Sequence, residues 1–129
     1  MARVTLLGMS KLKKLGQFNE GLDPVVQNAM FAEATIVLNE SKKIVPYDTR
    51  ALQTSGRVEK PKVQSGRYSI EITYGGAGAP YAVYVHEIPK NYNHGRQWKY
   101  LETPFMAHAD KFGRNVKERI AAHILRRVK

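Results

Sequence analysis

The sequence predicts an α+β fold, in which a small antiparallel sheet of three to four strands is packed by two long amphipathic helices. Two observations carry this prediction. Apolar residues recur at helical spacing in residues 24–44 and 104–126, whereas residues 67–74 alternate with a period of two. The expected order is helix, strand, strand, strand, helix, which is typical of an α+β sandwich. A chain of 129 residues suits one core, so a single domain is expected over residues 1–129.

The N-terminal segment is expected to precede this core as a candidate arm over residues 1–20. Within it, residues 3–7 have the composition of a short strand, and residues 10–15 that of a short basic helix.

The first long helix has a clear start and a clear end. Asp23 is a good N-cap because its carboxylate accepts free backbone N–H groups, and Pro24 is favoured at the first helical position. Pro46 cannot continue the helix. The apolar stripe comprises Val26, Ala29, Met30, Ala34, Val37, Leu38 and Ser41.

The middle of the chain is expected to form the sheet. Residues 67–74 place alternate side chains on one face, which is typical of a half-buried strand. A weaker strand is expected over 55–62, with a hairpin turn at 64–66. A third strand is expected over 81–87, after a glycine-rich hairpin connection at 75–80. The apolar face of the central strand comprises Tyr68, Ile70, Ile72 and Tyr74.

The second long helix follows a loop without periodicity at residues 88–101. Thr103 is the expected N-cap and Pro104 the first helical residue. The apolar stripe comprises Phe105, Ala109, Phe112, Val116, Ile120 and Ile124. The opposite, basic face carries Lys111, Arg114, Lys117, Arg119 and Arg126.

The chain is strongly basic, with 21 Lys and Arg against 11 Asp and Glu and a formal charge of +10. An excess of this size favours contact with polyanions. Because the charge is spread along the chain, solubility alone explains it equally well. The absence of cysteine excludes disulfides, thiolate nucleophiles and zinc–sulfur sites.

No residue pattern predicts catalysis, a metal site or a cofactor. The four histidines form no tight metal pair, and His86, Glu87 and His94 lack the carboxylate cluster that a hard cation needs. The glycine-rich residues 75–79 lack the Lys-Ser/Thr ending of a phosphate loop, and a strand rather than a helix is expected after them. We therefore expect a protein that is not an enzyme.

Aromatic and basic residues gather around the long loop. Such residues anchor protein interfaces, and they can also stack on bases. Core packing is the alternative, expected for Tyr68 and Tyr81. The candidate interface residues are Tyr84, Tyr92, Arg96, Trp98 and Tyr100. We expect the loop at 88–101 to stay mobile in the free chain and to reach a neighbouring subunit on assembly.

Three stretches resemble one family in the same order. Residues 44–55, Ile-Val-Pro-Tyr-Asp-Thr-Arg-Ala-Leu-Gln-Thr-Ser, look like a Val-Pro-x-Asp-Thr-Gly-x-Leu-x-x-Ser signature. Residues 79–87 resemble a Pro-Tyr-Ala run that leads to a glutamate, and residues 98–104 look like the entry to a C-terminal helix. Over about residues 20–125, the chain thus resembles the minor capsid, neck or tail-completion proteins of long-tailed phages.

The first of these stretches is expected to be a structural corner. Pro46 stops the helix, Asp48 and Thr49 can bond neighbouring backbone N–H groups, and Leu52 leads toward the first sheet strand. Arg50 stands where the family usually has glycine. A left-handed backbone there would strain Arg50.

The resemblance implies a structural protein of the virion, made in the host cytoplasm. The expected partners are copies of itself in a six- or twelve-fold ring at the head–tail junction, and neighbouring neck, head-completion and tail-terminator proteins. Transient contact with phage DNA is expected in the channel, and none with a membrane. The alternative is a small basic nucleic-acid-acting domain, such as a toxin-like ribonuclease. It explains the charge and the aromatic residues, but not three motifs in order.

Overall fold

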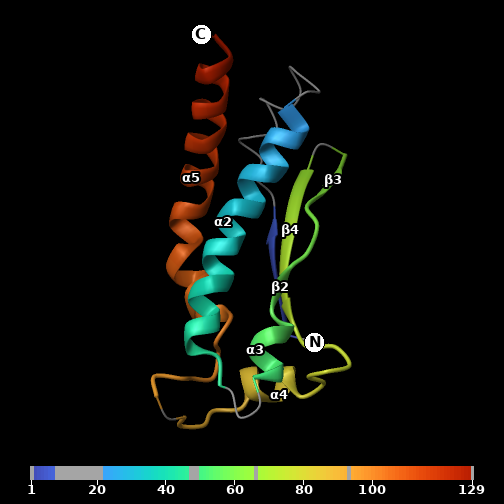
Figure 1. Cartoon of the computed structure of the whole chain (residues 1–129), viewed down its shortest axis with the longest axis vertical. Coiled ribbons are helices and arrows are strands. Elements are labelled where there is room, and N and C mark those ends of the chain that lie inside the picture. Colours follow the sequence, from blue (N-terminus) through green and yellow to red (C-terminus); the bar gives the residue numbers. More distant parts are fainter. Residues whose placement is uncertain (1, 8–21, 47–49, 66, 93, 129) are drawn as a thin grey trace.

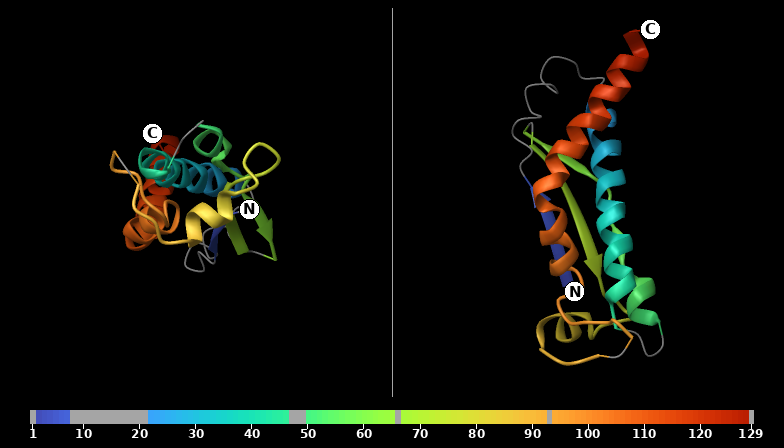
Figure 2. Two further views of the ribbon diagram at one scale, coloured as in Figure 1. Left: turned by 90° about the horizontal axis from the view of Figure 1, so that it is seen from below. Right: turned by 90° about the vertical axis from the view of Figure 1, so that its left-hand side faces the viewer.

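The chain folds into two layers, a pair of long helices and an antiparallel sheet. The computed structural model describes residues 2–7, 22–46, 50–65, 67–92 and 94–128. Helices α2 (Leu22–Ile44) and α5 (Glu102–Val128) lie along each other and cover one face of the sheet (Figures 1 and 2). The predicted α+β class and both predicted long helices are confirmed. The expected basic helix at 10–15 lies outside the described residues.

The sheet is built around one central strand, β4 (Arg67–Tyr74). Along one edge β4 pairs antiparallel with β1 (Ala2–Leu7), which confirms the predicted N-terminal strand. Along its other edge it pairs antiparallel with two short strands, β2 (Arg57–Val58) and β3 (Lys62–Gln64). The strand expected over 55–62 is confirmed only in part, because residue 55 ends a short helix, β2 covers 57–58 and β3 begins at 62. Pro61, which has no N–H to donate, lies between the two strands.

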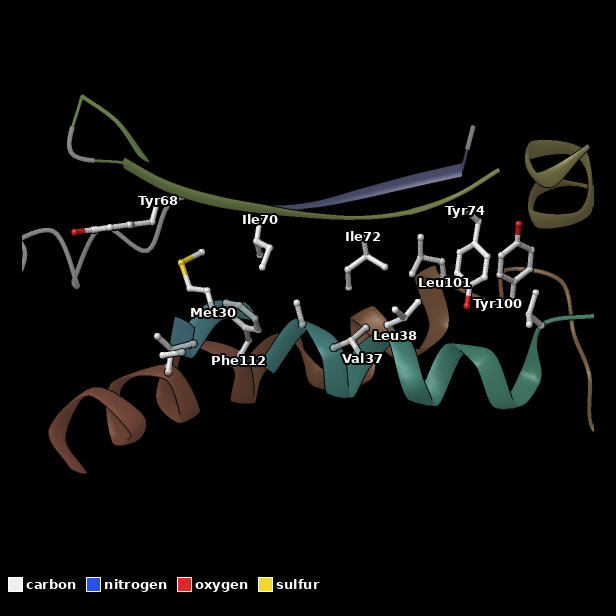
Figure 3. Close-up of a cluster of buried hydrophobic side chains, with 14 of the residues drawn as sticks. Met30, Val37, Leu38, Tyr68, Ile70, Ile72, Tyr74, Tyr100, Leu101 and Phe112 are labelled. Carbon is white, nitrogen blue, oxygen red and sulfur yellow. The ribbon is translucent and has the colours of Figure 1, made fainter. Parts of the chain in front are cut away.

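The core fills the space between the helices and the sheet (Figure 3). The alternation of β4 is confirmed, because its four apolar side chains all face the helices and are at most 3% exposed. Opposite them lie residues of both predicted helical stripes, among them Met30, Val37 and Phe112. Removal of this apolar surface from water is the main stabilising contribution, at about 25 cal/mol per Å².

One predicted strand is wrong. Residues expected to extend over 81–87 form a short helix, α4 (Ala82–Glu87), so the glycine-rich segment leads into a helix rather than a hairpin. Valine and tyrosine favour strands locally, but the buried side chains of this run are Ala82 and His86, four residues apart. Packing of that helical face overrides the local propensity.

The start of α5 also differs from the expected one. The helix begins at Glu102, so Thr103 lies in its first turn and is not the N-cap. The Thr103 hydroxyl instead accepts a hydrogen bond from the Gln97 side-chain amide at 3.1 Å. Further along the stripe Phe112 is buried, whereas Ala109 is exposed.

Candidate assembly surface

The three family-like stretches meet at one end of the molecule, where α2 ends and α5 begins. The first contributes helix α3 (Ala51–Ser55), the second contributes α4, and the third closes the loop at 88–101 and enters α5. These segments lie together at the lower end of the molecule in Figure 1.

A buried polar cluster joins this end to the sheet. The Ser41 hydroxyl donates to the Tyr100 carbonyl at 2.6 Å and lies 2.8 Å from the Tyr74 hydroxyl. Since serine has one proton to donate, Tyr74 donates to Ser41. The rings of Tyr74 and Tyr100 pack edge to face, and their centres are 4.9 Å apart (Figure 3).

Tyr100 is thus a core residue of its own subunit. Its side chain is fully buried, and its hydroxyl donates to the Ala82 carbonyl of α4 at 2.8 Å. This corrects the expectation that Tyr100 is an interface anchor, because its own subunit surrounds the ring and satisfies the hydroxyl.

His86 holds α4 against the start of α5. Its Nε2 accepts a hydrogen bond from the Glu102 backbone N–H at 3.2 Å. The proton of the neutral imidazole therefore lies on Nδ1, which is 2.9 Å from a Glu87 carboxylate oxygen and donates to it. Both ring nitrogens are satisfied by structural contacts, and the described residues contain no group of three or more His, Asp or Glu arranged to hold a metal ion.

An exposed ion cluster lies beside His86. Lys99 Nζ is 2.6 Å from one Glu87 carboxylate oxygen and 3.0 Å from one of Glu102. The hydrogen bond from Lys99 lowers the pKa of Glu87, and the bond to Glu87 raises the pKa of Lys99. Because both carboxylates are about half exposed, solvent screening keeps their contribution to stability small.

The second half of the long loop forms hydrogen bonds with helix α2 of its own subunit. Arg96 Nη1 donates to the carbonyls of Lys42 at 3.0 Å and Lys43 at 2.6 Å, and the Gln97 N–H donates to the Ile44 carbonyl at 2.8 Å. These are the last carbonyls of α2, which lack helical partners and carry the negative end of the helix dipole. Specific contacts therefore hold this part of the loop, contrary to what the lack of periodicity indicated.

The match to a known family covers the first two of these stretches and most of the third. Residues 9–102 match the family model described as "Bacteriophage HK97-gp10, putative tail-component". The chain belongs to this family. No curated protein and no solved structure matches the chain. The matched range includes the whole meeting point of α3, α4 and the loop, and it ends at the first residue of α5.

The corner of this HK97-gp10-like protein differs in part from expectation. Pro46 is buried, whereas Asp48 and Thr49 lie outside the described residues. Leu52 is 3% exposed, but it lies in helix α3 instead of leading directly into a strand. Arg50 has φ 65° and ψ 0°, the left-handed conformation that would explain a glycine at this position in the family.

Replacing Arg50 by glycine is expected to raise the free energy of unfolding by up to about 1 kcal/mol. A left-handed backbone costs an L-residue roughly 1–2 kcal/mol, and the greater freedom of glycine in the unfolded chain offsets part of the gain. Urea unfolding would measure the change. Arg50→Ala is the control, since it removes the side-chain contacts but keeps the strain. An Arg50→Gly variant that is less stable than Arg50→Ala would contradict this account.

Large apolar side chains are exposed on α4 and at its two ends. Tyr84 is 67% and Ile88 54% exposed, with Tyr81 and Val83 near 40%. We call these four residues the α4 patch. The expectation that Tyr81 packs in the core is wrong. Sequence reasoning missed Val83 and Ile88 because a strand was expected, although the spacing of 81, 84 and 88 fits one face of a helix.

The remaining candidate interface residues, Tyr92 and Trp98, are intermediate in solvent exposure. Tyr92 and Trp98 are half-buried in the loop, with Lys90 Nζ 5.5 Å from the centre of the Tyr92 ring. Their role at an interface stays a prediction. Across the described residues, none of the helices is long and apolar enough to cross a membrane.

Proposed function

We propose that this protein is a structural subunit of a tailed-phage particle, a neck or tail-completion protein that packs against copies of itself. Membership of the HK97-gp10-like family supports a tail-component role. The observation that carries the proposal is the junction of the three family-like stretches. They build a rigid end whose buried contacts are structural and whose outer face is the apolar α4 patch.

In this proposal the copies form a six- or twelve-fold ring at the head–tail junction, around the channel through which DNA leaves. The basic face of α5 supports a position near DNA. Lys111, Arg114 and Lys117 are exposed, and no carboxylate among the described residues forms a salt bridge with them. Unpaired cations of this kind attract phosphates without reading sequence.

Inactivating the gene in its phage is expected to yield DNA-filled heads and tails that fail to join, as seen by electron microscopy. Supplying the intact protein should restore joined, infectious particles that carry it at the junction. Joined and infectious particles without the protein would overturn the proposal. Hydrolysis of RNA by the purified protein, lost on unfolding, would favour the nucleic-acid-acting alternative.

A further inference from the structure

The α4 patch is where exposed apolar surface concentrates. Of the eight large hydrophobic side chains that are exposed among the described residues, four lie within residues 81–88. Single exposed residues are ordinary, but exposed apolar residues grouped on one face are typical of a surface that is covered in an assembly. The spacing of Tyr81, Tyr84 and Ile88 places these three on one face of α4, and Val83 lies beyond the exposed Glu87. The left view of Figure 2 looks onto this end, with α4 in the foreground.

The patch is held rigidly from inside. Three contacts from residues 99–102, at the entry to α5, fix α4. Tyr100 donates to the Ala82 carbonyl, the Lys99 N–H donates to the His86 carbonyl at 2.9 Å, and the Glu102 N–H donates to His86 Nε2. A surface fixed before contact loses little conformational entropy on binding. The patch is therefore suited to a stable joint.

A second, concave surface lies at the other half of the long helices. It is a groove of about 720 Å³ between the first half of α2 and the second half of α5. Of its twelve lining residues seven are polar or charged, and the apolar ones are mostly small: Val25, Ala29, Ala32 and Ala122, together with the exposed Ile36. We call it the α2–α5 groove. Small side chains on both helices leave room there for large ones from outside.

We infer that the α4 patch of one copy docks into the α2–α5 groove of the next copy, which forms the repeated joint of the ring. This inference rests on the proposed function. A ring needs two different surfaces on each subunit that complement each other. The α4 patch and the groove lie at opposite ends of the folded subunit, so the two surfaces do not overlap (Figure 1).

Charge favours the same pair of surfaces. With a formal charge of +10, copies repel one another, so their contacts should involve surfaces without excess positive charge. Near the patch, the carboxylates of Glu87 and Glu102 are matched by Lys99 and the exposed Lys90, so there is no excess positive charge. The groove is lined by two carboxylates and two guanidinium groups, and Glu33 and Arg119 among them form an ion pair at 2.7 Å.

Thiol cross-linking tests the joint directly, because the chain has no cysteine of its own. A variant that carries both Ile88→Cys and Ala32→Cys is expected to give a ladder of covalent multimers in purified particles treated with a short bis-thiol reagent. Each single variant should stay monomeric, as should Met106→Cys combined with Ala32→Cys. Dimers from Ile88→Cys alone would show that patch meets patch and would overturn the inference.

A surface variant gives a second measurement. Tyr84→Ser should weaken self-association roughly 10-fold or more, as for an aromatic residue at the centre of an interface, and leave the unfolding temperature unchanged. Met106→Ser, at a similarly exposed position, is the control and should assemble normally. If the protein is found at the head–tail junction but no patch–groove link forms, the joint is refuted and the proposed function stands. If particles join without the protein, the proposed function itself fails.

Discussion

Replacing Tyr100 by alanine is expected to lower the free energy of unfolding by about 3–5 kcal/mol, the usual cost of truncating a buried aromatic side chain. The ring is fully buried against Tyr74, and its hydroxyl bonds to α4. Domains are stable by only about 5–15 kcal/mol, so much of the total would be lost. Urea unfolding followed by circular dichroism would measure it. Because Tyr100 anchors α4, particle assembly should fail as well.

Two further variants separate packing from hydrogen bonding. Tyr100→Phe keeps the ring but leaves the Ala82 carbonyl without its donor, which should cost about 1–3 kcal/mol. Trp98→Ala, two residues away and half-buried, should cost less than Tyr100→Ala. Equal losses in the alanine and phenylalanine variants would show that ring packing is not what secures this end of the molecule.

Periodicity predicted the framework of the fold well. Regular spacing in α2, β4 and α5 reflects one face of each element buried against a common core, so the pattern is visible locally. The strain at Arg50 was also predictable, because the family-like motif has glycine where the backbone is left-handed.

The meeting point of the three stretches could not be predicted in the same way. Tyr100 and Arg96 have the composition of interface anchors, but core packing and helix capping use the same residue types. Arg96 reaches carbonyls more than 50 positions earlier in the chain, and the Tyr100 carbonyl meets Ser41, 59 positions away. Such contacts arise only when residues 96–100 have packed against α2, and they leave no local pattern in the sequence.

Two buried tyrosines of β4, Tyr68 and Tyr74, predict a loss of stability at alkaline pH. Burial raises the pKa of Tyr74 to about 12, and burial with a hydrogen bond to Asp23 raises that of Tyr68 to about 12. Both values exceed the ordinary 10.0, so the unfolded chain releases these protons first. Their contribution to stability is therefore complete below about pH 10 and is lost as the pH rises toward 12. For Tyr74, a rise of this size corresponds to roughly 3 kcal/mol.

Urea unfolding at several pH values between about 9 and 11.5 would measure this loss, and Tyr74→Phe is the matched control. Phenylalanine keeps the ring in the core but has no proton to release. The variant should therefore be less stable than the native chain near neutral pH, where the Tyr74 hydroxyl bonds to Ser41. Its stability should then fall less steeply in alkali, so the two curves converge. Lysines titrate in the same range in both proteins, and their effect cancels in the difference. Parallel curves would mean that ionisation of Tyr74 does not limit stability in alkali.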